Sequence, residues 1–201
     1  MQELQLKSNE ITVVIPCRHG TYPTTTLYHL SRQTIDQEDF KVIIIDDENK
    51  GACWARNKGF TYVDTEFVLF SDDDIEWKTF ALQLMRDWLN EIEEASYCYG
   101  AYRMNGGIYC NREFDPKALR RNNYISTMSL IRTRDFPGFD ESLLRLQDWD
   151  LWLTMLESDK IGVYCESIIY ETYLNPNGIS GCNSVINYKE AEEIVLKKHN
   201  L

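Results

Sequence analysis

The sequence predicts an α/β protein with a mostly parallel central sheet flanked by helices, together with a small antiparallel hairpin. Three observations lead to this fold class. Short apolar, β-branched runs alternate with helical stretches along the first half of the chain. The runs are continuously apolar, as expected for strands that are buried on both faces of a parallel sheet. Acidic residues follow two of these runs, at the strand ends where such a sheet opens its binding crevice.

The first half contains three predicted strands with helices between and after them. The strands are expected at 11–16, 41–46 and 66–71, and the helices at 24–34, 51–63 and 77–95. Right-handed β-α-β units of this kind place buried strands side by side in parallel. In the last of these helices Phe80, Leu84, Trp88 and Ile92 recur every four residues, so we expect them to form its packed face.

The second half begins with a hairpin pattern. Asn105-Gly106 supplies the positive φ angles of a type I′ turn between strands at 97–104 and 107–114. After these come, in order, a basic loop at 116–123, a strand at 124–133 and a turn at 136–142. Since no linker separates the two halves, we expect these strands to share one sheet with the first half.

The C-terminal part contains two predicted helices with a strand between them. The elements are a helix at 146–158, a strand at 161–174, a turn rich in Asn and Gly, and a charged helix at 188–199. One face of the first helix carries Trp149, Trp152, Leu153 and Leu156, which predicts that this face packs in the core. No internal repeat interrupts the 201 residues, so we expect residues 1–201 to form a single domain.

Composition narrows the classes of partner. The 21 basic and 32 acidic residues give a formal charge of −11, which argues against nucleic acid or an anionic membrane as the main partner. An anionic ligand would need a divalent cation to approach an acidic strand end. The N-terminus lacks the pattern of a signal peptide, and no apolar run reaches the roughly 18 residues that cross a bilayer. We therefore expect a soluble, cytoplasmic protein with no transmembrane segment, peripheral to a membrane only through partners, whose six scattered cysteines are reduced.

The acidic residues that follow the strands form two groups. Asp46 and Asp47 close the second predicted strand, and Asp72, Asp73 and Asp74 close the third. Because the carboxyl ends of parallel strands meet at one edge of a sheet, both groups are expected at the same crevice.

The order of four segments resembles the family 2 glycosyltransferases of GT-A fold. The segments are VVIPCRHG (13–20), IIIDDENKGACWARNKG (43–59), FVLFSDDDIEW (67–77) and FDESLLRLQDWDLWLTML (139–156). This resemblance, over residues from about 11 to 157, implies a Rossmann-like sheet. It implies transfer of a sugar from a nucleotide-diphosphate sugar, commonly a UDP-sugar, to a hydroxyl acceptor such as a glycan, with inversion, as in polysaccharide biosynthesis. It also divides the chain into a nucleotide-binding half, about 1–95, and an acceptor and catalytic half, about 96–201.

The resemblance further implies that the acidic cluster binds Mn²⁺ or Mg²⁺, which would neutralise the pyrophosphate as a Lewis acid. Where the family often has the first Asp of an Asp-x-Asp-Asp motif, this chain has Ser71. We assign the cation to Asp73, with Asp74 as a second ligand or a helix cap, and the ribose hydroxyls to Asp72. Asp72 and Asp74 are an alternative Asp-x-Asp pair. The structural alternative is that these carboxylates only cap the following helix.

By the same resemblance, further residues contact the nucleotide. Those at the end of the first strand are Pro16, Cys17 and Arg18. One carboxylate of the next strand end, Asp46 or Asp47, accepts a hydrogen bond from the base or the ribose. Arg56 packs against the base or donates to it, and its alternative fate is a surface ion pair.

The general base is expected near the start of the helix at 146–158. An inverting transfer needs a carboxylate that takes the proton of the acceptor hydroxyl as this hydroxyl attacks. Gln147-Asp148 stands where the family has Glu-Asp, so the resemblance assigns the base to Asp148. Asp150 is its rival, and a carboxylate that only stabilises the helix N-terminus is the structural alternative.

Two other functions compete with glycosyl transfer. A nucleotidyltransferase also uses a metal and a nucleoside phosphate, but it normally carries a Gly-rich, basic loop after its first strand, and CRHGTYP (17–23) matches this poorly. A catalytically inactive relative that only binds nucleotide or metal is favoured by the departures at Ser71, Glu48 and Gln147.

Overall fold

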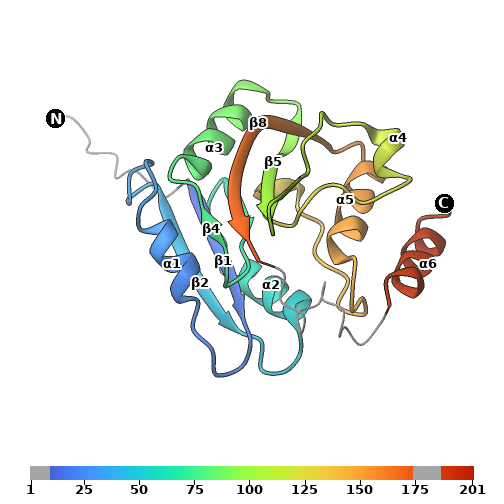
Figure 1. The fold of residues 1–201 in the computed structure, drawn as a ribbon, viewed down its shortest axis with the longest axis horizontal. Helices are drawn as coiled ribbons and strands as arrows, with labels where there is room; N and C mark the ends of the chain where they lie inside the picture. The colour runs from blue at the N-terminus through green and yellow to red at the C-terminus, as the bar shows by residue number, and fades with distance from the viewer. Residues whose placement is uncertain (1–9, 174–186) are drawn as a thin grey trace.

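In the part of the chain that the structure describes, eight strands form one mixed sheet, whose arrangement can be followed in Figure 1. The computed structural model describes residues 10–173 and 187–201. The strand order is β2-β1-β3-β7-β5-β8-β4, with β6 paired to β5. The strands are β1 (Ile11–Cys17), β2 (Phe40–Asp46), β3 (Phe67–Phe70), β4 (Glu76–Trp77), β5 (Ala95–Met104), β6 (Gly107–Tyr109), β7 (Leu130–Arg132) and β8 (Ile161–Thr172). Strands from both halves of the chain therefore share one sheet, as predicted.

The N-terminal part of this sheet is parallel. β1 is buried along its whole length and pairs in parallel with β2 on one side and with β3 on the other. The helices of this part are α1 (Thr24–Leu30), α2 (Ala52–Phe60) and α3 (Ala81–Glu91). At Gly59 of α2 a Cβ atom would lie 2.3 Å from a methyl carbon of Val14, so only glycine permits this close approach of helix to strand. These elements confirm the predicted β-α-β pattern.

The prediction that β2 is buried on both faces is wrong. β2 is intermediate or exposed at most positions, and Ile44 is 38% exposed. In the described sheet β2 is the terminal strand and pairs with β1. A continuous apolar run did not distinguish this edge strand from a central one.

The predicted packed face of α3 is also wrong in part. The helix begins at Ala81 because residues 76–77 pair with β8 as the short strand β4. Its fully buried residues are Ala81, Leu82, Met85 and Leu89. Phe80 precedes the helix and is 40% exposed, while Leu84, Trp88 and Ile92 are partly buried against the same core.

The second half adds β5, β6, β7 and β8 to the sheet. β5 and β8 pair in parallel over most of their lengths, and β7 pairs antiparallel with β3 and β5. The hairpin is confirmed: Met104 pairs with Gly107, and Asn105 and Gly106 have φ angles of 47° and 84°. β6 is shorter than predicted because Cys110, with a φ angle of 56°, turns the chain out of the strand.

Two predicted elements between the hairpin and α5 (Gln147–Glu157) are wrong. The expected basic loop contains the short helix α4 (Pro116–Leu119), which the Asp115 carboxylate caps by accepting from the N–H groups of Lys117 and Ala118. The expected strand at 124–133 is reduced to β7, which is followed by the 3₁₀ helix η1 (Thr133–Asp135). Residues 124–128 instead lie along a cavity.

The predicted core face of α5 is confirmed. Trp149, Trp152, Leu153 and Leu156 are all buried. The indole N–H groups of Trp149 and Trp152 donate to the backbone oxygens of Leu119 and Ile125, which satisfies their polar atoms inside the core. The predicted last helix is α6 (Tyr188–Lys198), and the predicted turn rich in Asn and Gly falls on residues outside the described ranges.

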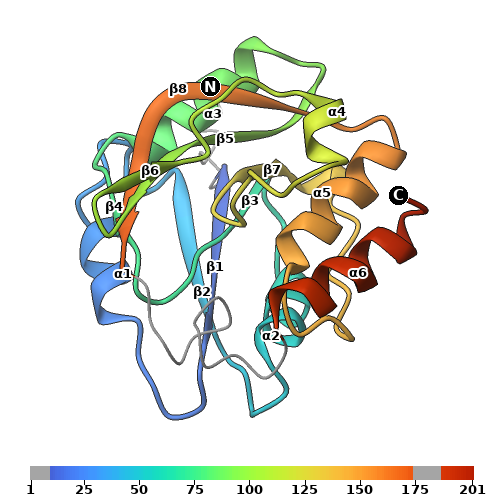
Figure 2. The same cartoon turned by 45° about the vertical axis from the view of Figure 1, so that its right-hand side comes forward.

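The sheet is covered on both faces. Val14, Val68 and Phe70 point to a core that also contains α5 and α6, whereas their neighbours Val13, Ile15 and Leu69 point to a core under α1 and α3. In Figures 1 and 2, α6 lies beside α5, and α1 lies at the opposite side of the molecule. Alternation of apolar residues in β1 and β3 toward two cores explains why their runs are continuously apolar.

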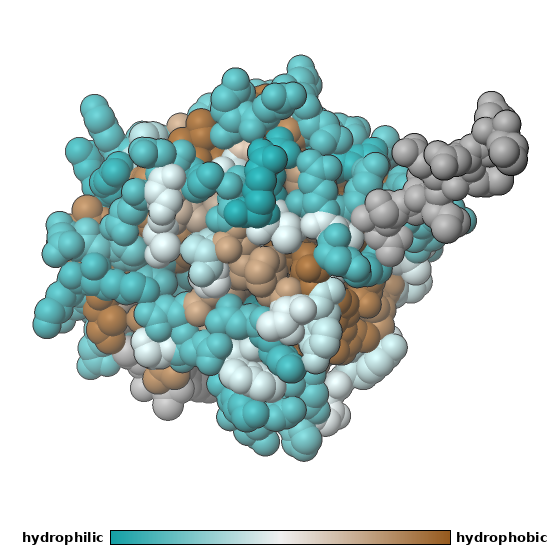
Figure 3. Space-filling model, turned by 180° about the vertical axis from the view of Figure 1, so that it is seen from behind, coloured by the Kyte–Doolittle hydropathy of each residue, from teal (hydrophilic) through white to brown (hydrophobic). Residues whose placement is uncertain are grey.

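One face of the molecule is largely hydrophilic. Figure 3 shows a mostly hydrophilic face on which apolar side chains form separate patches. In the described ranges no helix is long and apolar enough to span a membrane. The five described cysteines are free thiols, as predicted for them: Cys17, Cys53, Cys98, Cys110 and Cys165.

Candidate active site

A cavity of about 820 Å³ lies at the carboxyl ends of β1 and β3 and extends to the β5–β6 hairpin, the end of β8 and the start of α5. It brings together nearly all residues that the sequence predicts for the site. Those that line it are Pro16, Cys17, Arg18, Asp47, Arg56, Asp72, Asp73, Asp74 and Asp148. Residues up to 132 positions apart in the chain, from Pro16 to Asp148, thus share one space.

Asp46 is the predicted site residue that does not line the cavity. Its carboxylate lies 3.0 Å from Nδ1 of His19 and accepts a hydrogen bond from the N–H of Glu48. This backbone bond, followed by the His19 contact, lowers the pKa of Asp46, and Asp46 in turn raises the pKa of His19. Asp47 lines the cavity instead, and its Oδ1 accepts from the N–H groups of His19 and Asn49. Asp47 is therefore the member of the pair that faces the cavity.

Ser71, which replaces the first Asp of the family motif, is part of the core. It is fully buried, and its Oγ accepts a hydrogen bond of 3.0 Å from the indole N–H of Trp77. The same hydroxyl donates to the backbone oxygen of Asp72. The side chain at this position thus supports the acidic turn from beneath and does not line the cavity.

Asp72 forms an ion pair with Arg56. The Nη2 of Arg56 donates to Oδ1 of Asp72 at 2.7 Å. The Arg56 side chain is 5% exposed, whereas that of Asp72 is 41% exposed. The guanidinium also lies 5.3 Å from the ring centroid of Phe139. Arg56 is therefore a buried cation beneath the cavity, and the predicted alternative of a surface ion pair is wrong.

The surroundings of Asp73 and Asp74 disfavour the ionised form of each carboxylate. Desolvation and the charge of Asp72 raise the pKa of Asp73, and Arg18 partly offsets this. Desolvation in the cavity and the charges of Asp72 and Asp73 raise the pKa of Asp74 to about 6. The helix-cap alternative is wrong, because β4 follows these residues and α3 begins at Ala81 without a side-chain cap.

The carboxylates at the acidic turn fit a divalent cation whose coordination shell a substrate would complete. Across residues 10–173 and 187–201, no group of three or more His, Cys, Asp or Glu side chains is arranged to hold a metal. Mg²⁺ sites often use one or two carboxylates, with water and substrate phosphates completing the shell. Asp73 and Asp74, whose charged forms are disfavoured without a cation, match this two-carboxylate pattern.

Asp148 lies on the cavity wall in the first turn of α5. Its Oδ1 accepts from the N–H of Trp149, and its carboxylate bonds to the side chain of Asn123. Burial raises the pKa of Asp148, while Asn123 and the charge of Arg56 lower it. A carboxylate with a raised pKa in a ligand cavity is a stronger base than a surface carboxylate.

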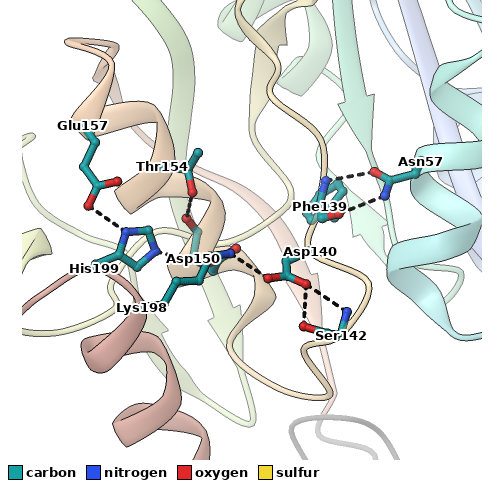
Figure 4. A network of polar contacts seen from close by, with 9 residues as sticks. All are labelled: Asn57, Phe139, Asp140, Ser142, Asp150, Thr154, Glu157, Lys198 and His199. Carbon is teal, nitrogen blue, oxygen red and sulfur yellow. Dashed lines mark hydrogen bonds and ion pairs between the residues drawn. The ribbon is translucent and has the colours of Figure 1, made fainter.

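Asp150, the predicted rival, is excluded by its position. It is 3% exposed, and its carboxylate forms an ion pair with Lys198 at 2.7 Å and lies 2.9 Å from Nε2 of His199, at the end of α6 (Figure 4). It does not line the cavity. Asp148 and Asp150 are two positions apart in α5. Residues with this spacing do not share a face of a helix, so their side chains point to different sides of α5.

The structure adds residues that the sequence analysis did not assign to the site. Tyr102 stacks between Tyr109 and Tyr170, at centroid distances of 5.3 and 4.9 Å, and all three line the cavity. The hydroxyl of Tyr170 lies 2.6 Å from Oγ of Ser126. The sequence could have predicted that Tyr102 and Met104 lie on one face, because side chains alternate along the strands of the predicted hairpin. It could not have predicted the contact of Tyr102 with Tyr170, because this contact depends on the register of β5 against β8.

Comparisons with known proteins agree with this geometry. Residues 26–144 match the family model described as glycosyl transferase family 2. The chain is 25% identical over 178 residues to the UDP-Glc:α-D-GlcNAc-diphosphoundecaprenol β-1,3-glucosyltransferase WfgD of Escherichia coli, a match that covers 80% of this chain and 70% of that protein.

Solved structures show the same fold at low identity. The S. aureus TarS chain of residues 1–349 in complex with UDP-GlcNAc superimposes with a TM-score of 0.74 at 17% identity, covering 94% of this chain and 66% of that one. The mannosyltransferase PcManGT from Pyrobaculum calidifontis, in complex with GDP-Man and Mn²⁺, gives 0.66 at 12%, covering 86% and 59%. The chain thus spans less than two thirds of these solved chains. By its family match the chain belongs to glycosyl transferase family 2, and it is a glycosyltransferase of GT-A fold.

Proposed function

We propose that this chain transfers a sugar from a UDP-sugar to a hydroxyl group of a glycan acceptor, by a single displacement that inverts the anomeric centre. The observation that carries the proposal is one cavity that joins the acidic turn Asp72–Asp74 to the carboxylate of Asp148. The relatives support the donor class, since WfgD is named for UDP-Glc and TarS is solved with UDP-GlcNAc. The WfgD acceptor is itself a sugar linked to a lipid diphosphate.

The nucleotide would occupy the part of the cavity formed by the N-terminal half. The residues assigned to it are Pro16, Cys17, Arg18, Asp47, Arg56 and Asp72. We assign Asp47, and not Asp46, to the base or ribose, because Asp47 lines the cavity. Asp72 is assigned to the ribose hydroxyls, since its side chain remains 41% exposed while one oxygen accepts from Arg56. Arg56, being buried and hydrogen-bonded to Asp72, would orient this carboxylate.

Asp73 and Asp74 would hold Mn²⁺ or Mg²⁺ together with the donor diphosphate. When bound, the cation supplies Lewis-acid neutralisation of the negative charge that builds on the leaving nucleotide. Desolvation, followed by the charge of Asp72, disfavours the ionised form of both carboxylates, and this supports the assignment because a cation would relieve it. The structure of PcManGT with GDP-Man and Mn²⁺ gives a precedent in a protein of the same fold.

Asp148 would remove the proton of the attacking hydroxyl. Its Oδ1 is tied to the N–H of Trp149 and its carboxylate to Asn123, which fixes its orientation in the first turn of α5. Burial raises its pKa and so increases its basicity, while the hydrogen bonds from Asn123 and the Trp149 N–H and the charge of Arg56 partly offset this. The halves of the chain would thus divide the work: residues up to about 95 bind the nucleotide, and the rest supply the base and bind the acceptor.

The proposal is tested by thermal shift and calorimetry with the nucleotide alone. UDP, GDP and CDP are each titrated into the protein with and without Mn²⁺. We expect UDP to bind only when Mn²⁺ is present, and Asp73→Asn to abolish this binding. Asp36→Asn, at an exposed position outside the cavity, is the matched control and should bind as the wild type does. If none of the three nucleotides binds, either with or without the metal, the proposal is refuted.

A further inference from the structure

A row of aromatic rings runs from the core of the sheet into the cavity. Trp77 lies 5.3 Å from Tyr170, Tyr170 lies 4.9 Å from Tyr102, and Tyr102 lies 5.3 Å from Tyr109, measured between ring centroids. The planes of Tyr102 and Tyr170 differ by 4°, and those of Tyr102 and Tyr109 by 20°. Trp77 and Tyr170 are 1% exposed, whereas Tyr109 is 45% exposed. The row is therefore rigid at its inner end and ends on a ring that a ligand can reach.

The hairpin register places this last ring in the cavity. Tyr102 pairs with Tyr109, and Met104 pairs with Gly107, so all four lie on one face of the hairpin. Tyr102, Met104 and Tyr109 line the cavity, while Ile108 points to the other face. A Cβ atom at Gly107 would lie 3.0 Å from the Tyr109 ring, so glycine lets the ring lie close to the hairpin backbone. The orientation of Tyr109 is thus set by Tyr102 and by Gly107.

Three rings of the row, those of Tyr102, Tyr109 and Tyr170, line the same cavity as the proposed base Asp148. Burial is the main cause that raises the pKa of Tyr102, and the nearby charge of Asp148 adds to it. The lining of this cavity also includes the polar side chains of Asn122, Asn123 and Thr127. A wall of stacked aromatic rings with a few polar groups at its edge suits a ligand that has one apolar face and a polar rim.

We propose that Tyr109 is a platform for a pyranose ring of the acceptor, an inference that rests on the proposed function. A pyranose presents a face of C–H bonds, which the negative face of an aromatic ring attracts, and a rim of hydroxyls that need hydrogen-bond partners. The acceptor hydroxyl must meet Asp148, and Tyr109 lines the same cavity as Asp148, so the sugar ring that carries this hydroxyl can stack on Tyr109. The acceptor is therefore a glycan whose reacting sugar stacks on the β5–β6 hairpin.

The test uses simple sugars as probes. Methyl glycosides of glucose, galactose and N-acetylglucosamine are each added to the full chain with UDP and Mn²⁺, and binding is followed by saturation-transfer NMR. We expect transfer to the ring protons of at least one glycoside in the wild type. Tyr109→Ala should weaken this binding by about five- to tenfold, because the stacking surface is lost. Tyr109→Phe, which keeps the ring and removes the hydroxyl, should bind like the wild type.

Ile108→Ala is the matched control on the opposite face of the same hairpin, and it should change neither binding event. UDP binding is measured by calorimetry in the same samples. The platform is overturned if the wild type binds UDP but no glycoside, or if Tyr109→Ala binds UDP and the glycoside as tightly as the wild type does. Either result leaves the donor assignment intact. Wild-type protein that does not bind UDP refutes the proposed function and with it the platform.

Discussion

Arg56 donates from Nη2 to Oδ1 of Asp72 across 2.7 Å, with the cation buried and the carboxylate partly in solvent. The two partners therefore differ in what each would lose without the other. A buried guanidinium without its carboxylate has no access to water, whereas Asp72 without Arg56 stays hydrated. The pair also fixes the first residue of the acidic turn, which connects the stability of α2 to the shape of the cavity.

This asymmetry gives the first prediction. Asp72→Asn should lower the free energy of unfolding by about 2–3 kcal/mol, because it leaves the buried Arg56 without its hydrogen-bonded carboxylate. Arg56→Met, which fills the same space beside Phe139 with an apolar chain, should cost only about 1 kcal/mol. Urea unfolding of both variants checks this. A larger loss for Arg56→Met than for Asp72→Asn would contradict the burial argument.

The second prediction concerns Asp148. Asp148→Asn should lower kcat by about 10²- to 10⁴-fold, the range of general base catalysis, and leave the affinity for UDP with Mn²⁺ unchanged. The isosteric amide keeps the contact with the N–H of Trp149 and removes only the basic oxygen. Steady-state transfer assays and UDP calorimetry on the same preparation separate the two effects. Asp159→Asn, which lies just after α5 and outside the cavity, is the control. Undiminished kcat in Asp148→Asn would remove this residue as the base.

The third prediction concerns the pH dependence of the acidic turn. In the folded protein the pKa of Asp74 is raised from 3.8 to about 6, so its ionised form is disfavoured by folding. Its destabilising effect is absent below about pH 3.8, grows as the pH rises to about 6, and is constant above that. Asp74→Asn should therefore be more stable than the wild type above pH 6 and equally stable near pH 4, as measured by urea unfolding without metal. Binding of Mn²⁺ with UDP should weaken as the pH falls through 6, because protons compete for the same carboxylate.

The fourth prediction concerns the docking of α6. The Nζ of Lys198 lies 2.7 Å from carboxylate oxygens of both Asp140 and Asp150, and His199 bridges Asp150 to Glu157 (Figure 4). Lys198 lowers the pKa of Asp140 to about 2, so the stabilisation from this carboxylate is present above its unfolded pKa and is lost as the pH falls toward 2.

Lys198→Met should accordingly lower the free energy of unfolding by about 1–2 kcal/mol at pH 7, since buried Asp150 loses one of its partners. Lys197→Met, one residue earlier and also exposed, should stay within about 0.5 kcal/mol of the wild type. Equal losses in the two variants would show that the ion pairs of Lys198 do not hold α6.

Residues that belong to local patterns were predictable. Continuous apolar runs located β1 and β3, Asn105-Gly106 located the hairpin, and the resemblance of four segments brought Asp73 and Asp148 to one site. What failed depends on contacts between distant segments. The edge position of β2 follows from the strand order, and the late start of α3 follows from pairing of residues 76–77 with β8. The aromatic row needs the registers of β4, β8, β5 and β6 together, which no local pattern contains.

The last prediction concerns Ser71, the departure from the family motif. Ser71 is fully buried, and its hydroxyl accepts from Trp77 and donates to the backbone of Asp72. Ser71→Asp restores the motif in sequence, but it places a carboxylate in the core beside the aromatic row. In the described chain the hydroxyl of Ser71 is hydrogen-bonded to the Trp77 indole and the Asp72 backbone, neither of which is a cation. We expect it to lower the free energy of unfolding by about 3 kcal/mol or more and not to tighten Mn²⁺ binding.

Ser71→Ala, which leaves the Trp77 indole N–H without its acceptor, should cost about 1–2 kcal/mol. Urea unfolding and Mn²⁺ titration in the presence of UDP measure both effects. A stable Ser71→Asp protein with tighter Mn²⁺ binding would show that this position faces the cation, and that the metal site includes residue 71 as well as Asp73.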